Sequence, residues 1–342
     1  MPAIGSGKVL VTGANGFIAV WVVKTLLEQG FAVRGTVRSE SKAAHLRETF
    51  KSYGDKLEIV IVEDITKEGA FDEAVKGVDA IEHTASPFHF KAVEPDELIV
   101  PAVHGTTGIL QSALKFGTAI QRVVVTSSCA AVLTLSTEPR VFRETDWNEG
   151  SVQEVRAQGA GATAPAKYRA SKTLAERAAW AFVEEHKGEI AWDLVVLNPP
   201  FVFGPVIHEV DSAEGLNESA REWYLKVVKG EVDNDTLANV GSSYVDVRDL
   251  ALAHALALTK PEAGGERIIV SASVYKWQDW VSAAHRVEPT LPAGNTAYDP
   301  SKATHLFQYA PEKERRLLGV PFRTLEQTTK DILDDFKARG WL

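Results

Sequence analysis

Patterns typical of strands and of helices alternate along this 342-residue chain, and this alternation constrains the fold more than any other feature. Runs rich in β-branched residues predict strands at Lys8–Thr12, Phe31–Val37, Leu57–Val62, Ala80–Thr84, Arg122–Ser127, Trp192–Leu197 and Arg267–Ser271. Helical patterns fall between them, over residues 16–29, 39–50, 67–76, 95–116, 166–186 and 247–258. Alternating strands and helices form βαβ units, so we expect an α/β fold with a parallel sheet covered on both faces.

The first predicted strand leads into a glycine-containing turn, and the next helix follows directly. Gly13 can make a tight turn, and Gly16 lets the backbone approach a pyrophosphate at the helix N-terminus. Asn15, Phe17 and Ile18 complete the stretch that would hold a dinucleotide. The position between strand and helix favours a Rossmann-type doubly wound parallel sheet, although a purely structural turn is the alternative.

The end of the second predicted strand indicates which dinucleotide binds. An NAD enzyme generally has an acid there, whereas this strand ends in Val37 and Arg38, and Lys42 lies one turn into the next helix. A guanidinium suits a 2′-phosphate and a lysine adds charge, so the sequence favours NADP(H). Asp64 and Ile65 follow the third strand, where an adenine edge would lie, but Asp64 could equally cap the following helix.

The alternation breaks after Ser128, and this break guides the division into domains. Residues 129–165 have scattered Gly, Pro, Thr and Asn, so we expect a long functional loop. After residue 198 the pattern is mixed and indicates a smaller, interleaved C-terminal substrate lobe. We expect residues 1–198 with 240–272 to form the dinucleotide-binding domain, and residues 199–239 with 273–342 to form the lobe.

Composition excludes several other classes of function. A net charge of −9 and the absence of a long Lys/Arg run argue against a nucleic-acid partner. The start of the chain does not resemble a signal peptide, and no segment is apolar enough for a membrane span. The lone Cys129 fits a reducing compartment, so we expect a cytoplasmic protein. The nine histidines are scattered without metal-ligand spacing, so we expect no metal.

Tyr168 and Lys172 lie four residues apart in a predicted helix, and therefore on one face of it. A free tyrosine has a pKa of about 10, and a nearby ammonium would lower that pKa and stabilise the phenolate. Ser128, at the end of the fifth strand, could donate a hydrogen bond to a substrate oxygen. The spacing alone also occurs on exposed helices, but here it accompanies the glycine turn.

Together these motifs resemble the extended form of the short-chain dehydrogenase/reductase superfamily. Within it the chain is most similar to fungal NADPH-dependent aldehyde and methylglyoxal reductases, with plant dihydroflavonol and cinnamoyl-CoA reductases as cousins. The resemblance covers most of the chain and rests on residues 12–19, 64–65, 83–87, 126–128, 168–172, 198–199, 203–205 and 244–249.

The resemblance implies a role for each matching residue. Tyr168 would be the general acid in reduction, Lys172 the residue that lowers its pKa, and Ser128 the donor that positions the oxygen. Thr84, Ala85 and Ser86 would pass beneath the nicotinamide ribose. Pro199 and Val202 would cover the nicotinamide. The expected function is NADPH-dependent reduction of aldehydes or ketones by hydride transfer.

One position departs from the pattern of this superfamily, and two other functions are alternatives to carbonyl reduction. Many extended members have an asparagine that assists a proton relay, and Ala102 stands in its place here. A nucleotide-sugar epimerase or dehydratase is one alternative, but Cys129, Ala130 and Ala131 replace the acids that follow the dehydratase serine or threonine. A non-catalytic NADP-binding sensor is the other, and such proteins usually lack the tyrosine and lysine.

Apolar side chains near these motifs are candidates for the substrate pocket, although each could equally belong to the core. The candidates are Phe88, Phe90, Ala130, Val132, Phe201 and Trp223. Apolar walls suit a small neutral carbonyl or alcohol substrate. The resemblance leaves open whether the chain is a monomer or a homodimer.

Overall fold

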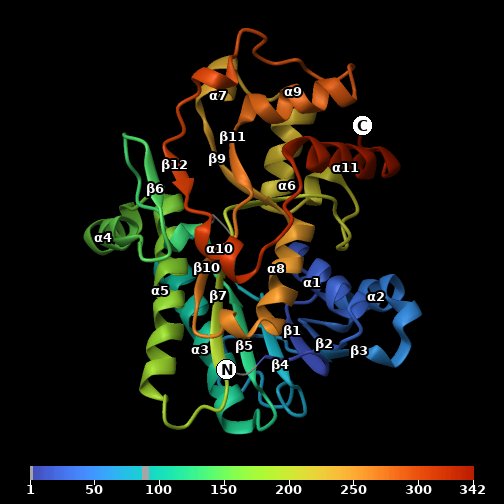
Figure 1. The fold of residues 1–342 in the computed structure, drawn as a ribbon, viewed down its shortest axis with the longest axis vertical. Helices are drawn as coiled ribbons and strands as arrows, with labels where there is room; N and C mark the ends of the chain where they lie inside the picture. Colours follow the sequence, from blue (N-terminus) through green and yellow to red (C-terminus); the bar gives the residue numbers. More distant parts are fainter. Residues whose placement is uncertain (1–2, 87–91) are drawn as a thin grey trace.

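A seven-stranded parallel sheet forms the centre of the molecule in a computed structural model, which describes residues 3–86 and 92–342 (Figure 1). Its strands are β1 (Lys8–Thr12), β2 (Ala32–Val37), β3 (Leu57–Ile61), β4 (Ala80–His83), β5 (Arg122–Thr126), β7 (Asp193–Asn198) and β10 (Arg267–Ile269). Their order is β3-β2-β1-β4-β5-β7-β10, so the chain changes direction across the sheet between β1 and β4. The carboxyl ends of the strands at such a switch point form the usual ligand crevice of this architecture. The predicted α/β fold is confirmed.

Helices cover both faces of this sheet because its strands are buried on both sides. Val9 and Val11 of β1 pack with α1 (Phe17–Glu28), α2 (Glu40–Thr49) and α8 (Val247–Thr259). Leu10, between these two valines, packs in a second core that includes α3 (Asp96–Phe116) and α5 (Ala164–Glu185). Neighbouring residues of a strand point to opposite faces, so one apolar run supplies both cores.

The C-terminal part of the chain builds a smaller lobe on a second sheet, with strand order β11-β9-β8. Its strands are β8 (Phe201–Phe203), β9 (Gly241–Asp246) and β11 (Ser273–Lys276), and its helices are α6 (Glu218–Trp223), α7 (Asn234–Asn239), α9 (Trp277–Val287), α10 (Glu312–Leu317) and α11 (Leu325–Ala338). A π-helical turn, Tyr224–Val228, continues α6. The domain division expected from the sequence is wrong at one point, because β9 pairs with β8 and β11 rather than with the large sheet.

Two segments differ from the sequence prediction. Residues 67–76 form turns rather than a helix, and Gly69 and Gly77 at either end have positive φ angles of 73° and 68°. Residues 129–165 are not a continuous loop. They contain β6 (Arg140–Phe142), α4 (Glu149–Gln158) and short 3₁₀ turns. β6 pairs in parallel with β12 (Phe307–Tyr309) of the lobe, which joins the segment after Ser128 to the C-terminal part of the chain.

Aromatic side chains fill the core of the lobe and hold its sheet against its helices. Trp280 lies 5.2 Å from Phe203 and 5.0 Å from Tyr244, measured between ring centres. Trp223 packs at 6.2 Å from Trp280 and 6.0 Å from Phe336 of α11. No helix in the described part of the chain is both long and apolar enough to cross a membrane.

Candidate active site

The glycine turn after β1 is shaped for the close approach of a ligand. Gly13 has a φ of 64°, and a Cβ atom there would lie 3.2 Å from Ala85. A Cβ atom on Gly35 of β2 would lie 2.8 Å from the Cβ of Ala14, so only glycine fits beside the turn. Within the described residues no side chain caps the N-terminus of α1 at Gly16, which leaves its first N–H groups available to an anion. These features fit a dinucleotide pyrophosphate.

The residues expected to bind the adenosine end lie around the end of β2. Arg38 is exposed there. Lys42 forms a 2.9 Å ion pair with Glu209 of the lobe. The Asp64 carboxylate accepts hydrogen bonds from the amide and hydroxyl of Thr66, which lower its pKa, so Asp64 does stabilise a local turn. The cation at the strand end fits a 2′-phosphate better than a bare ribose hydroxyl.

Ser128 emerges from the carboxyl end of β5, where neighbouring strands hold it. Its Oγ accepts a hydrogen bond from the Ala130 amide at 3.1 Å, and its carbonyl accepts one from Asn198 Nδ2 at 3.1 Å. The Cys129 amide donates to the Pro199 carbonyl at 2.8 Å. The ends of β5 and β7 are therefore fixed to each other at the predicted catalytic serine.

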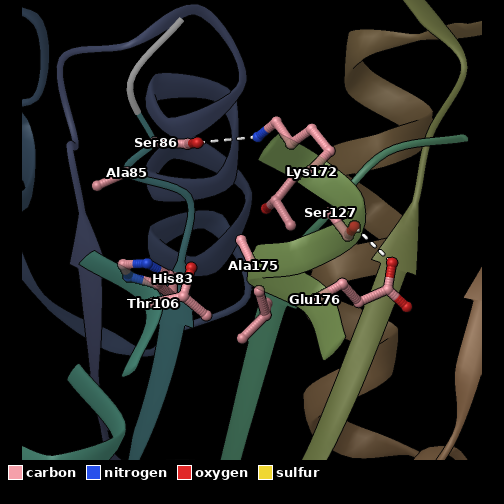
Figure 2. A pocket seen from close by; sticks show the side chains of 10 residues that line it. His83, Ala85, Ser86, Thr106, Ser127, Lys172, Ala175 and Glu176 are labelled. Carbon is pink, nitrogen blue, oxygen red and sulfur yellow. Dashed lines mark hydrogen bonds between the residues drawn. The ribbon is translucent and has the colours of Figure 1, made fainter. Parts of the chain in front are cut away.

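Tyr168 and Lys172 lie on consecutive turns of α5, beside this strand end. The Tyr168 hydroxyl is hydrogen-bonded to the Ser128 side chain. The Lys172 ammonium donates to the Ser86 hydroxyl at 2.9 Å, at the end of the segment that follows β4 (Figure 2). The structure therefore brings Ser128, Tyr168, Lys172 and Ser86 together, although they come from three separate elements.

Burial sets the proton affinities of the helix pair. It raises the pKa of Tyr168 to about 12, and the hydrogen bond with Ser128 opposes the rise. It lowers the pKa of Lys172 to about 8, and the negative charge of Glu176 opposes the fall. Loss of water around the phenol is the largest influence on the Tyr168 pKa in this structure, so the lowering expected from Lys172 stays a prediction.

A small cavity lies beneath Lys172, between α5 and the ends of β4 and β5 (Figure 2). Its lining includes His83, Thr106, Ser127, Lys172 and Glu176. The sequence motifs did not single out the roles of His83, Thr106 and Glu176. The only available signal was the spacing of Glu176, four residues after Lys172 on the same helix face.

His83 is a neutral donor in this cavity. Thr12 Oγ1 accepts hydrogen bonds from the amides of Thr84 and Ala85, so its own hydrogen is directed to His83 Nδ1, 3.0 Å away. The ring proton then resides on Nε2, which is buried without a hydrogen-bond partner among the described residues. Burial and the charge of Lys172 lower the pKa of His83 to about 3.

The residues expected to contact nicotinamide or substrate fall into two groups. Thr84, Ala85 and Ser86 are half-buried in the crevice, whereas Pro199 and Val202 are buried after β7. Phe201 is 40% exposed and Ala130 is buried beside Ser128. The pocket assignment of the remaining described candidates is corrected, because Val132 packs with Cys129 and Phe142, and Trp223 is 1% exposed in the lobe core. Phe88 and Phe90 lie outside the described residues.

Known proteins are similar to this chain over nearly its whole length. A ketoreductase of Aspergillus niger is 37% identical over 340 residues, which covers 95% of this chain and 96% of that protein. An NADPH-dependent methylglyoxal reductase of Saccharomyces cerevisiae is 36% identical over 337 residues, with 95% and 96% coverage. The solved structure of a yeast methylglyoxal/isovaleraldehyde reductase complexed with NADPH matches with a TM-score of 0.87 at 33% identity, over 98% of this chain and 100% of that one.

A family model agrees with these pairwise likenesses and confirms the resemblance drawn from the motifs. The model describes the NAD dependent epimerase/dehydratase family and matches residues 9–272, from β1 to just beyond β10. Among the residues that the structure describes, no cluster of three or more His, Cys, Asp or Glu side chains is placed to hold a metal ion. The chain belongs to the NAD dependent epimerase/dehydratase family, the extended short-chain dehydrogenases/reductases.

Proposed function

We propose that this protein reduces small aldehydes or ketones to alcohols with NADPH, and that Tyr168 is the general acid. The observation that carries the proposal is the hydrogen-bonded pair of Ser128 and Tyr168 beside the buried ammonium of Lys172. These groups lie at the strand ends next to the glycine turn. A proton donor, an oxygen-positioning hydroxyl and a cation therefore surround one point in the crevice.

Each side chain has a distinct task in the reaction. NADPH, when bound, supplies the hydride for the carbonyl carbon. The Ser128 hydroxyl donates a hydrogen bond to the carbonyl oxygen, and the Tyr168 hydroxyl transfers its proton to that oxygen as negative charge develops there. Tyr168 is left as a phenolate, which the Lys172 ammonium stabilises. Product release and reprotonation of Tyr168 restore the starting state.

Relatives and charge both support reduction over epimerisation. Among the relatives that align over about 95% of the chain, one is named as a ketoreductase, one as a methylglyoxal reductase and one, from Sporidiobolus salmonicolor, as an aldehyde reductase. Two of the matching solved structures are described as complexes with NADPH. The exposed Arg38 at the end of β2 agrees with that coenzyme, because a guanidinium pairs with a 2′-phosphate.

The substitution Tyr168→Phe tests the proposal because it removes only the hydroxyl. We expect turnover with a panel of aldehydes and ketones, followed through NADPH oxidation, to fall by about 10²–10⁴-fold. NADPH binding, measured by fluorescence titration, should change little. Tyr53→Phe, in the 3₁₀ turn before β3, is a matched control that should keep full activity.

Three results would contradict the proposal. Full activity of Tyr168→Phe would remove the general-acid assignment. Tight NADPH binding by the unaltered protein with no turnover of any carbonyl compound would favour a sensor of NADP(H), and conversion of a nucleotide sugar would favour an epimerase.

A further inference from the structure

Glu176 is a buried carboxylate outside the triad of Ser128, Tyr168 and Lys172, and it is 2% exposed. Its Oε2 accepts hydrogen bonds from Ser127 Oγ at 2.6 Å and from Asn198 Nδ2 at 2.8 Å. Its Oε1 pairs with the Arg267 guanidinium. A carboxylate is retained in a protein interior only when such donors compensate for the loss of water.

These donors belong to the strands that present the catalytic serine. Ser127 directly precedes Ser128, and Asn198 donates from the same amide nitrogen to the Ser128 carbonyl. One carboxylate of α5 therefore ties the ends of β5 and β7 to the helix that carries Tyr168 and Lys172. A displacement of Glu176 would move the serine relative to the tyrosine.

Arg267 extends this network into the segment after Ser128. Its guanidinium donates to the carbonyl of Ala131 at 3.2 Å and to that of Glu144 at 2.8 Å, and it lies 3.8 Å from the ring centre of Trp147. The network therefore spans β5, β7, β10, α5 and the segment that begins with the catalytic serine. Arg267 also neutralises part of the charge of Glu176.

The charge of Glu176 acts on Lys172 from one helical turn away. Both side chains line the cavity beneath the ammonium, together with neutral His83 (Figure 2). The other titratable groups around the pair are Tyr168 on the same helix and Cys129, which burial keeps as a thiol by raising its pKa. Glu176 is thus the anionic group of the cavity lining, and it counteracts the effect of burial on Lys172.

We propose that Glu176 is a positioning residue for the reduction: it fixes Ser128 against the helix of Tyr168 and supplies a counter-charge to the Lys172 ammonium in the cavity that both side chains line. This inference deepens the proposed function and rests on it. The geometry gives Glu176 a role that the tyrosine–lysine spacing does not reveal.

The substitution Glu176→Gln removes the charge at nearly constant volume, and the Lys172 titration is the direct readout. In the cofactor-free protein with ¹³C-labelled lysines, we expect the NMR midpoint of Lys172 to fall by about one pH unit. The alkaline limb of turnover should move to lower pH by a similar amount. Glu185→Gln, an exposed position on the same helix, should leave both midpoints unchanged.

Two further variants separate charge from scaffolding. Arg267→Gln should raise the Lys172 midpoint, because the charge of Glu176 is then no longer offset by its buried counter-ion. If the two residues acted only as a scaffold, Glu176→Gln and Arg267→Gln would shift the Lys172 midpoint in the same direction. Glu176→Gln with Arg267→Gln removes both charges and should recover thermal stability while the Lys172 midpoint stays low. Arg267→Gln and the double variant still test the charge role of Glu176 if the Glu176→Gln variant alone folds poorly.

The outcomes divide clearly. An unchanged Lys172 midpoint in both the Glu176→Gln and the double variant overturns the charge role of Glu176. Unchanged turnover of the Glu176→Gln variant overturns its positioning role. Because the NMR titration needs no coenzyme or substrate, a protein without reductase activity would refute the proposed function while leaving the effect on Lys172 measurable.

Discussion

The substitution Trp223→Ala tests whether the aromatic cluster of the lobe is core or pocket wall. Trp223 is 1% exposed and packs between Trp280 and Phe336. Its indole nitrogen has no hydrogen-bond partner among the described residues, so the substitution removes packing without breaking a hydrogen bond. The change in stability then reports burial and the cavity left behind.

The expected cost follows from measured large-to-small substitutions. Truncation of a buried tryptophan to alanine costs about 3–5 kcal/mol of unfolding free energy. At about 2.1 cal/mol/K per residue, a chain of 342 residues has an unfolding entropy of about 0.7 kcal/mol/K. The melting temperature should therefore fall by about 4–7 °C.

Scanning calorimetry and steady-state kinetics on the same variants supply the assay. The matched control is Phe201→Ala, because Phe201 is 40% exposed on the neighbouring strand β8 and its loss should cost less than about 1 kcal/mol. We expect Trp223→Ala to lower stability with little change in KM. Phe201→Ala should change KM with little loss of stability. A stable Trp223→Ala variant with a strongly raised KM would refute the core assignment.

Three further predictions concern the coenzyme and the pH profile. Arg38→Asp should weaken NADPH binding by about 10–100-fold, because one charge-assisted contact is lost, and should weaken NADH binding far less. Equal effects on both coenzymes in fluorescence titrations would contradict a role of Arg38 in binding the 2′-phosphate. Gly35→Ala should weaken both coenzymes alike, because the added methyl would lie 2.8 Å from Ala14 in the glycine turn, and retained affinity for either coenzyme would contradict the close packing. Reduction should decline as pH rises through about 8, where Lys172 loses its proton, and Lys172→Met should abolish this limb along with most of the activity.

Local sequence patterns predicted the large sheet well because its central strands, such as β1, β5 and β7, are buried on both faces and read as nearly continuous apolar runs. They failed at residues 67–76, where Phe71, Ala74, Val75 and Val78 have helical spacing and are buried. Gly69, with its positive φ, starts a series of turns there instead of a helix. Apolar spacing reports which side chains are buried and does not by itself report the backbone.

A non-local contact accounts for one element that was missed, and a weak local signal accounts for another. β6 is a strand only because it pairs with β12, more than 150 residues later in the chain, and no local pattern announces such a pairing. The helix α4 begins at a cap formed by Asn148, whose side chain accepts from the Ser151 amide, but Gly150 in its first turn weakens the helical signal. Trp223 was a candidate for either the pocket or the core, because a sequence does not distinguish a large apolar wall from a core residue.

For the site, sequence spacing identified the groups but not the balance of their charges. In the folded chain burial raises the pKa of Tyr168 to about 12, so at neutral pH the phenol holds the proton that the reduction consumes. The limiting titration is then that of Lys172, whose pKa of about 8 is a compromise between burial and Glu176. A residue at position 176 that keeps the hydrogen bonds but lacks the charge would therefore leave the triad intact in outline and lower the pH at which reduction begins to decline.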